Sequence, residues 1–422
     1  MKCPICEGIE FTNLDYLRTK AEGFCICQNC GFITYEKSEK EITDMYKVSA
    51  HNAVRKFAGT NDLNTKFHKL PYHKRMLHKH LSKTVKPKNL LDYGCSTGYI
   101  LNWIKENYAY NVTGIELNPA HAEYGRREYG LDIHEVAKLS ELPDQDKKYD
   151  LIINFAVLEH IVDPVTALKE MREHLSDDGI IYLMTPVWFK SLYDSDWRIK
   201  HFEELFVPHH INVFSEISRN NCFKLAGLEI IERTDAMYGD IVILKKCPPS
   251  DDIEKENAKK MIVKISEYKQ AIEAMFKQDY ATSLALVPNN PEVYYIKAMK
   301  EKDNVKEHER LLNKSIEVMP NYAKLYENKG IFHLQTGEYK KAIELFNKAI
   351  ELCPNQYQSY WNLAEIAFIN EDYDLAIKHL KDLIEVNPML EHKNFNKDAD
   401  TVRDRLGQIY AVIASEKNDT SL

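Results

Sequence analysis

The sequence predicts an α/β core domain between a small cysteine-rich module and a C-terminal all-α region. Three observations predict this order. Five of the nine cysteines lie within the first thirty residues, strand-like and helix-like patterns alternate over residues 89–246, and prolines recur every 34 residues in the C-terminal part. A chain of 422 residues is also too long for one ordinary domain.

The overall composition excludes two classes of partner. The net charge is −8, which argues against nucleic acid because phosphate binding needs a cationic face. No apolar run approaches the ~18–20 residues that span a bilayer. The N-terminus lacks the apolar segment of a signal peptide. We therefore expect no nucleic-acid partner, no membrane span and a cytoplasmic location.

The first module, residues 1–34, contains two C-x2-C pairs separated by twenty residues. Each pair lets two thiolates approach one ion from a tight turn, and tetrahedral zinc takes four such ligands. In a reducing compartment this clustering favours a metal over disulfides. The pattern predicts a zinc ribbon, whose bound Zn²⁺ supplies folding energy that so short a segment lacks. Cys25, on a predicted strand, is expected to be a packed residue. The expected ligands are Cys3, Cys6, Cys27 and Cys30.

Residues 35–88 are mostly polar and are expected to form a helical connector or lid. Lys66 to Lys88 is rich in histidine and lysine. A solvated helix face is the simpler interpretation of such a run. Its position just before the first core strand leaves open a role beside the site for a phosphate-bearing substrate.

Residues 89–246 alternate between the two periodicities, which indicates a mostly parallel sheet covered by helices on both faces. The last two strands are joined by a short connection and are expected to form an antiparallel edge hairpin. The expected strands are Asn89–Tyr93, Asn111–Glu116, Leu131–His134, Tyr149–Phe155, Gly179–Thr185, Leu228–Arg233 and Asp240–Lys245. The expected helices include Tyr99–Tyr108, Ala120–Tyr129 and Asp163–Leu175.

The first core strand runs into the turn Gly94-Cys-Ser-Thr-Gly98, which precedes a helix. Two glycines allow a tight turn and a close approach of a ligand to the backbone. Glu116 ends the second strand eighteen residues after Gly98, where a carboxylate can accept both hydroxyls of an adenosyl ribose. A nicotinamide enzyme would want Gly-x-Gly-x-x-Gly, which is absent from this turn.

The fourth strand leads into Val157-Leu-Glu-His160, at the sheet edge where ligands of open α/β sheets bind. Asp163-Pro164 follows and is expected to cap the next helix, with Asp163 at the N-cap.

Together these motifs resemble class I S-adenosylmethionine (SAM) dependent methyltransferases, over about Tyr46 to Lys246. The resemblance implies a Rossmann-like fold and SAM as cofactor. Ser96 departs from the family, which usually has glycine there. By the resemblance, the glycine turn backs the methionine part of SAM, Glu116 holds the ribose and Ala137 flanks the adenine. The implied cofactor residues are Asp92, Gly94, Cys95, Gly98, Glu116, Leu117, Ala137, Asn154 and Phe155.

The segment His209-His210-Ile-Asn-Val-Phe-Ser215 resembles part of the acceptor half of small-molecule methyltransferases. That group includes ubiquinone-type O-methyltransferases and sugar C-methyltransferases with an N-terminal zinc module. The latter often have Glu-His where this chain has two histidines, so we expect O-methylation rather than C-methylation. Histidine suits a general base at neutral pH. The catalytic candidates are His210 first and His160 second, and the substrate candidates are Tyr46, Glu159, Trp188 and His209. A capping role for His210 before the Ser215 helix remains an equal alternative.

The region from 251 to 422 follows a Pro-Pro linker and loses its strand signals. Pro320, Pro354 and Pro388 mark a 34-residue period, and the small and aromatic residues between them resemble tetratricopeptide repeats. We expect helix pairs stacked into a short solenoid, with a degenerate repeat from Pro288 and a capping helix over Asp398–Ser415.

Three functional hypotheses follow. The first is a methyltransferase acting on a small molecule, above all a sugar that is nucleotide-linked or part of a glycan. The second is a protein methyltransferase whose solenoid recruits the acceptor protein. The third is an adaptor with a relic Rossmann-like domain, against which intact Gly94, Gly98 and Glu116 argue.

Overall fold

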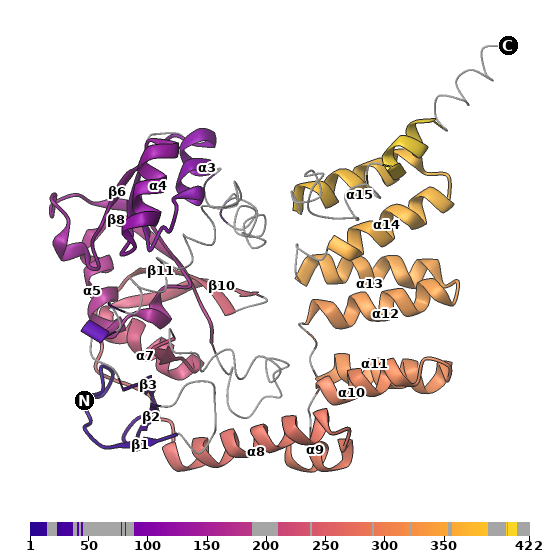
Figure 1. Ribbon diagram of the computed structural model, residues 1–422, viewed down its shortest axis with the longest axis horizontal. Coiled ribbons are helices and arrows are strands. Elements are labelled where there is room, and N and C mark those ends of the chain that lie inside the picture. Colours follow the sequence, from indigo (N-terminus) through magenta and orange to yellow (C-terminus); the bar gives the residue numbers. More distant parts are fainter. Residues whose placement is uncertain are drawn as a thin grey trace. The chain divides into compact units, whose positions relative to one another are not determined.

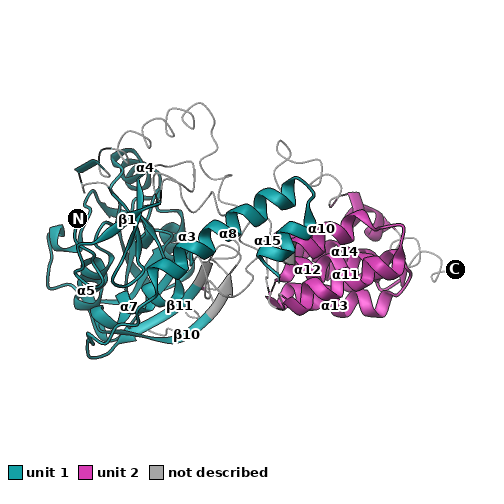
Figure 2. Cartoon of the chain, turned by 90° about the horizontal axis from the view of Figure 1, so that it is seen from below, with its two compact units in different colours: residues 1–61, 81–290 teal, residues 62–80, 291–422 magenta. Residues whose placement is uncertain are grey.

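The chain forms two compact units in the computed structural model. The first combines residues 1–61 and 81–290, and the second combines 62–80 and 291–422 (Figure 2). In the described part, no helix is both long and apolar enough to cross a membrane. Apart from a few isolated positions, the structure describes residues 1–14, 23–36, 88–187, 210–236, 239–288, 291–318, 322–352, 357–386 and 404–411.

A seven-stranded sheet forms the centre of the first unit, in the order β10-β11-β8-β7-β4-β5-β6 (Figure 1). Strands β6, β5, β4, β7 and β8 are parallel, and β11 and β10 add an antiparallel edge. Chain order reverses at β4, and folds of this kind bind ligands at the carboxyl ends of the strands beside such a reversal. The strands are β4 (Lys88–Tyr93), β5 (Tyr110–Ile115), β6 (Asp132–His134), β7 (Tyr149–Phe155), β8 (Leu175–Thr185), β10 (Leu228–Ala236) and β11 (Gly239–Lys246).

All seven expected strands are present, and the edge hairpin is confirmed. The largest difference in a strand's start is at β8, which begins at Leu175 rather than Gly179. Leu175 pairs with Tyr149, and the next pair is Ile180 with Leu151. The register therefore shifts here, and β8 has more residues than β7 between the two pairs. Such local register shifts leave no signal in the hydrophobic pattern.

Helices cover the sheet, and three of them begin at well-formed caps, one of which is a capping box at Ser215. Asp163 accepts a hydrogen bond from the backbone of Thr166 at 3.0 Å and Pro164 occupies the first helical position, which confirms the expected cap. Asn118 caps the preceding helix in the same way. The helices are α3 (Tyr99–Asn107), α4 (Pro119–Tyr129), α5 (Pro164–His174) and α7 (Glu216–Ala226).

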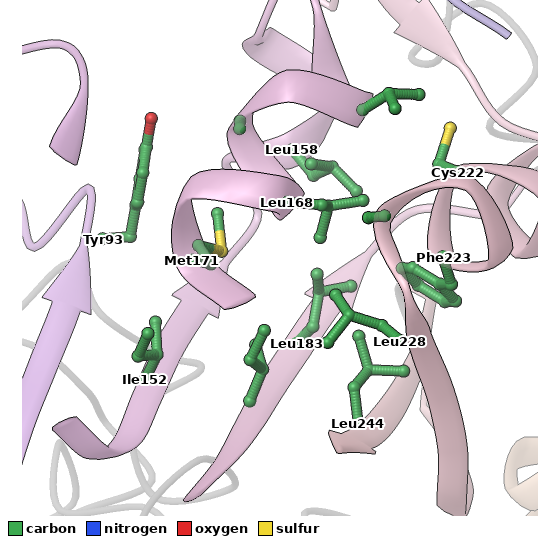
Figure 3. Packing of buried hydrophobic residues seen from close by; sticks show 14 of the residues in the cluster. Tyr93, Ile152, Leu158, Leu168, Met171, Leu183, Cys222, Phe223, Leu228 and Leu244 are labelled. Atoms are coloured by element: carbon green, nitrogen blue, oxygen red, sulfur yellow. The ribbon is translucent and has the colours of Figure 1, made fainter. Parts of the chain in front are cut away.

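The core under α5 and α7 is continuous and apolar (Figure 3). Leu168 and Met171 on α5 and Phe223 on α7 lie over Leu183 and Leu244 of the sheet. Burial of each such side chain contributes about 1.5–3 kcal/mol.

A second, four-stranded sheet belongs to the four-cysteine module (residues 1–36) and has the order β1-β2-β3-β9. Its fourth strand, β9 (Asn212–Val213), comes from the α/β domain and pairs antiparallel with β3. Phe32 and Cys30 of the module also belong to the core that contains Phe214 and Phe223. The module and the α/β domain are therefore packed together as one folded unit. The module's own strands are β1 (Phe11–Asn13), β2 (Phe24–Cys27) and β3 (Ile33–Tyr35).

Two helices beyond residue 250 also belong to the first unit. The sequence placed the start of the helical repeats at residue 251, whereas the structure groups the chain up to Asn290 with the first unit. The reason is α8 (Ala258–Phe276), whose Met261 and Ile265 pack on Ile26 of β2. The helix α9 (Tyr280–Leu286) then follows α8.

The second unit consists of paired helices. Gly330 on α12 lies so close to α13 that a Cβ there would stand 2.7 Å from the ring of Phe346, which is why a small residue occurs at this repeat position. Residues 404–411 are helical within the expected capping helix. The helices are α10 (Pro291–Lys300), α11 (Val305–Val318), α12 (Ala323–Gln335), α13 (Tyr339–Leu352), α14 (Tyr357–Ile369) and α15 (Tyr373–Val386). The connector expected over 35–88 lies almost entirely outside the described residues.

Candidate active site

The turn between β4 and α3 contains two glycines with a left-handed backbone conformation. Gly94 has a φ of 79° and Gly98 a φ of 74°, a region that L side chains rarely adopt. A Cβ at Gly94 would also lie 2.5 Å from the side chain of Val157, which follows β7. Both glycines are therefore required by the backbone, and at Gly98 a Cβ would likewise lie 2.5 Å from the side chain of Leu131.

Ser96, where the family usually has glycine, has a φ of 50° and so keeps the glycine-like conformation. Two contacts hold it there. Its backbone N–H donates to Glu116 Oε2 at 2.8 Å, and its hydroxyl lies 3.3 Å from His121 Nδ1. Glu116 Oε1 also accepts the backbone N–H of Asn118 at 2.8 Å. The Glu116 carboxylate thus ties the tip of β5 to the turn, and its backbone donors do not use all four of its lone pairs.

Of the two carboxyl groups at this turn, Asp92 is buried and Glu116 is half-buried. Burial, together with the nearby charge of Glu116, raises the pKa of Asp92 to about 8. Burial also raises the pKa of Glu116, while backbone N–H groups of Asn118, Ser96 and Leu117 oppose that rise. Acidic groups desolvated in this way favour a ligand that brings hydroxyl donors or positive charge.

Two buried amides beside the turn have atoms without a hydrogen-bond partner among the described residues. Asn154 on β7 is fully buried, and neither its Nδ2 nor its Oδ1 is paired. Nδ2 of Asn118 is in the same situation. An unpaired buried polar group costs about 1–3 kcal/mol. Such groups at the carboxyl ends of β5 and β7 are suited to a polar ligand such as the adenosyl and methionine parts of SAM.

The remaining residues expected at the cofactor fall into two groups. Cys95 is buried with its sulfur beside Gly114 of β5, so only its backbone can line the turn. The carbonyl of Ala137 accepts a hydrogen bond from the Tyr93 hydroxyl at 2.8 Å, which fixes the loop after β6. The other two, Leu117 and Phe155, are half-buried at the ends of β5 and β7.

Three of the residues that the sequence nominates for the acceptor lie close together. Glu159 and His160 lie on the short helix η3 (Leu158–His160), and His210 precedes β9. Their ligating atoms all lie within 4.8 Å of one another, and the two imidazole rings are 5.1 Å apart between centroids. Glu159 is buried and accepts the Thr185 hydroxyl at 3.0 Å. The structure thus brings together both histidines that the sequence nominated. Tyr46, Trp188 and His209 lie outside the described residues.

The four cysteines of the module converge. The sulfurs of Cys3 and Cys30 are 3.6 Å apart and those of Cys6 and Cys27 are 3.5 Å apart. All four lie within 4.8 Å of one another. A tetrahedral zinc ion about 2.3 Å from each sulfur needs sulfurs about 3.8 Å apart, so this donor set fits Zn²⁺.

Burial raises the pKa of Cys27 to about 11, so a bound cation has to stabilise its thiolate form. Cys25 is not one of the four. Its thiol donates to the carbonyl of Thr34 at 3.4 Å within the small sheet. Gly31, directly after Cys30, has a φ of 78°, which the close turn around the sulfurs requires.

Sequence reasoning missed three residues of this region. His121 contacts Ser96, Asn118 bonds Glu116, and Asn212 connects β9 to two other segments. The Asn-Pro cap before α4 was a usable local signal for Asn118. Asn212 stands in the His209–Ser215 motif, but its partners, like that of His121, are distant in sequence, and the sequence alone does not identify them.

Comparisons with known proteins agree with this geometry. Residues 67–233 match the family model described as a methyltransferase domain. Over 167 residues the chain is 29% identical to a probable SAM-dependent methyltransferase of Mycolicibacterium smegmatis, covering 39% of this chain and 61% of that protein. It is 32% identical over 102 residues to a tRNA U34 carboxymethyltransferase of Nautilia profundicola, covering 23% of this chain and 34% of that protein.

A ubiquinone biosynthesis O-methyltransferase of Haemophilus ducreyi is 29% identical over 107 residues, which cover 23% of this chain and 45% of that protein. The matches thus span 34% to 61% of these relatives' own length. Two tetratricopeptide models match residues 323–356 and 357–388. The chain therefore contains a methyltransferase domain, followed by tetratricopeptide repeats.

Proposed function

We propose that this protein is a SAM-dependent methyltransferase. The observation that carries the proposal is the convergence of Glu116, the unpaired amide of Asn154 and the glycine turn on one sheet edge, where chain order reverses. Bound SAM supplies an electrophilic methyl group. The methyltransferase relatives support the same activity.

The residues around this edge then have separate tasks. Glu116 accepts the ribose hydroxyls with the lone pairs that its bonds to Ser96 and Asn118 leave. Asn154 pairs its buried amide with the polar part of the cofactor. The loop of Ala137, fixed by Tyr93, flanks the adenine. Binding in this manner holds the donor in line for attack, which contributes more to rate than any single contact.

The acceptor in this proposal is a small molecule, a nucleotide-linked sugar or a glycan unit, methylated on oxygen. The support is the four-cysteine module before the α/β domain, because the sugar-modifying enzymes that the chain resembles carry an N-terminal zinc module. His210 takes the proton of the acceptor hydroxyl, and His160 is the second candidate for this role. Glu159, 3.8 Å from His160 Nε2, stabilises the positive charge that the pair acquires. The names of the matched relatives point to varied roles, among them a tRNA U34 carboxymethyltransferase and an O-methyltransferase of ubiquinone biosynthesis.

We propose further that Cys3, Cys6, Cys27 and Cys30 hold one structural Zn²⁺. All four coordination positions are then occupied by thiolates, which leaves none for a substrate. The ion therefore stabilises the small sheet and takes no part in methyl transfer.

The test combines binding and transfer. Calorimetry with SAM should show binding at one site per chain. Tritium from methyl-labelled SAM should then appear in one member of a panel of nucleotide sugars. Turnover should fall at least about 100-fold in His210→Gln, the typical contribution of a general base. Absence of SAM binding would contradict the proposal, and full turnover of His210→Gln would contradict the assigned base.

A second function is favoured by the tetratricopeptide repeats, because such solenoids present surfaces to protein partners. In that case the acceptor is a protein that the repeats recruit. Truncation after Asn290, where the first unit ends, separates the two proposals. Transfer to a sugar survives the truncation, whereas tritium incorporation into a protein acceptor is lost.

A further inference from the structure

Both backbone polar groups of Ile211, the residue after His210, form hydrogen bonds to other segments. The N–H of Ile211 donates to the carbonyl of Glu159 at 2.8 Å, and the carbonyl of Ile211 accepts the N–H of Tyr35 at 2.8 Å. Glu159 belongs to η3, next to His160, and Tyr35 belongs to β3 of the four-cysteine module. The backbone after His210 therefore bridges the module and the loop that carries the other histidine.

The side chain of Asn212 repeats this bridge one residue later. Its Oδ1 accepts the hydroxyl of Thr34 on β3 at 3.1 Å, and its Nδ2 donates to the carbonyl of Ile161 at 2.6 Å. Ile161 directly follows His160. Asn212 is 2% exposed and Thr34 4%, so water does not compete for these bonds.

The bonds form a chain from the module to the histidine pair. Thr34 holds Asn212, which lies two residues after His210, and Asn212 holds Ile161, which follows His160. Neither Thr34 nor Asn212 belongs to the three-residue cluster of Glu159, His160 and His210. Their effect on that cluster therefore acts through the backbone that they fix.

We propose that Asn212 and Thr34 are positioning residues, through which the four-cysteine module sets the placement of His210 against His160. The importance of this placement rests on the proposed function, in which the pair accepts the proton. The positioning of His210 by Thr34 and Asn212 does not depend on that function. A purely structural role for the bond would change the unfolding temperature and leave the relative placement of the two rings unchanged.

The hydroxyl of Thr34 is the most selective place to test this. Thr34→Val removes the hydroxyl at nearly constant volume, whereas Thr34→Ser keeps it and serves as the matched control. Thr34→Ala removes the same hydroxyl with a smaller side chain and provides a second variant should the valine protein fail to fold. Each is made in the full chain, with and without His210→Gln.

The readout is the carbon–proton signal of the His160 ring in protein labelled with ¹³C-histidine. The ring of His210, 5.1 Å away, shifts this signal in the parent protein, so His210→Gln displaces it. We expect the same displacement with Thr34→Ser and its loss or marked reduction with Thr34→Val and Thr34→Ala. The proposal is overturned if His210→Gln displaces the His160 signal as much in the Thr34→Val and Thr34→Ala proteins as in the parent. It is also overturned if His210→Gln does not displace the signal in the parent background.

Calorimetry with SAM on the same proteins keeps this result separate from the proposed function. The glycine turn and Glu116 lie on other segments, so SAM affinity should be equal in Thr34→Val and Thr34→Ser. A parent protein that fails to bind SAM contradicts the proposed function, whereas the ring comparison still decides the role of Thr34. A SAM affinity that falls only in Thr34→Val shows that the bond supports the whole domain, which contradicts selective positioning.

Discussion

Glu116, at the tip of β5, accepts the backbone N–H of Ser96 at 2.8 Å. Within the turn Gly94–Gly98, Ser96 is the residue that has a side chain and yet a left-handed backbone, and this bond holds it there. The same carboxylate bonds the residue that caps α4, Asn118. One acidic side chain thus shapes the turn and faces the proposed ribose site. Loss of Glu116 should therefore affect cofactor binding more than loss of one ligand contact.

Glu116→Ala should raise the Kd for SAM about 10- to 100-fold, because hydrogen bonds to a charged group contribute about 1.5–3 kcal/mol. Calorimetry measures the change. Glu173→Gln, an exposed acid on α5, is the control and should bind SAM as the parent does. Equal affinity of the Glu116→Ala protein would remove the ribose assignment.

The two left-handed glycines Gly94 and Gly130 provide a matched pair. A Cβ at Gly94 meets Val157 at 2.5 Å, whereas a Cβ at Gly130 meets no described atom within 4 Å. Gly130→Ala should cost only the conformational strain of about 1–2 kcal/mol and keep SAM binding. Gly94→Ala should cost more and lose SAM binding. Thermal unfolding and calorimetry on both variants check this, and equal behaviour would show that the turn is not a cofactor cradle.

Much of the α/β sheet was predictable because buried parallel strands are short apolar runs bounded by turns. Tyr149–Phe155 has the same bounds in the sequence and in the structure. The cysteine spacing likewise predicted which four sulfurs meet, and Cys25 was correctly left out of that set.

What the sequence did not predict depends on contacts between distant segments. Thr34 and Asn212 are 178 positions apart, and neither neighbourhood shows that β9 adds to the cysteine-rich sheet. The apolar face of α8 was equally compatible with repeat packing, and only the structure shows it on Ile26. The sequence nominated His160 and His210 as candidate residues, whereas their proximity depends on these long-range contacts.

The buried carboxyl of Asp92 should make stability depend on pH. Its pKa rises from 3.8 to about 8 on folding, so the folded protein holds a proton that the unfolded chain releases between these values. Stability from this group is therefore present at low pH and falls as pH rises through that interval, by up to about 1.4 kcal/mol per pH unit. Asp92→Asn cannot ionise.

The difference in unfolding temperature between Asp92→Asn and the parent, measured without SAM, should therefore grow in favour of the variant from pH 5 toward pH 8. Titrating groups that do not interact with Asp92 cancel in this difference. A difference that stays constant with pH would show that Asp92 is ionised throughout the range.

The cysteine module offers its own control. Metal analysis of the purified parent should give about one zinc per chain. Cys27→Ser should lose the ion, because three thiolates bind it much less tightly, whereas Cys25→Ser should retain it. Zinc retained in full by Cys27→Ser, or absent from the parent, would contradict the assignment of the four ligands.

Two glycines of the second unit should respond in opposite directions to added volume. A Cβ at Gly330 stands 2.7 Å from the fully buried ring of Phe346, whereas a Cβ at Gly407 meets no described atom within 4 Å. Gly330→Val should therefore separate α12 from α13 and cost about 1–3 kcal/mol, the usual cost of overpacking. Gly407→Ala lies in a helix and should stabilise it by about 0.5–1 kcal/mol. Thermal unfolding of both full-length variants measures the two shifts, and calorimetry should find SAM affinity unchanged in each, because Glu116 and the glycine turn belong to the first unit. A loss of SAM affinity in Gly330→Val would instead show that the repeats support the cofactor site.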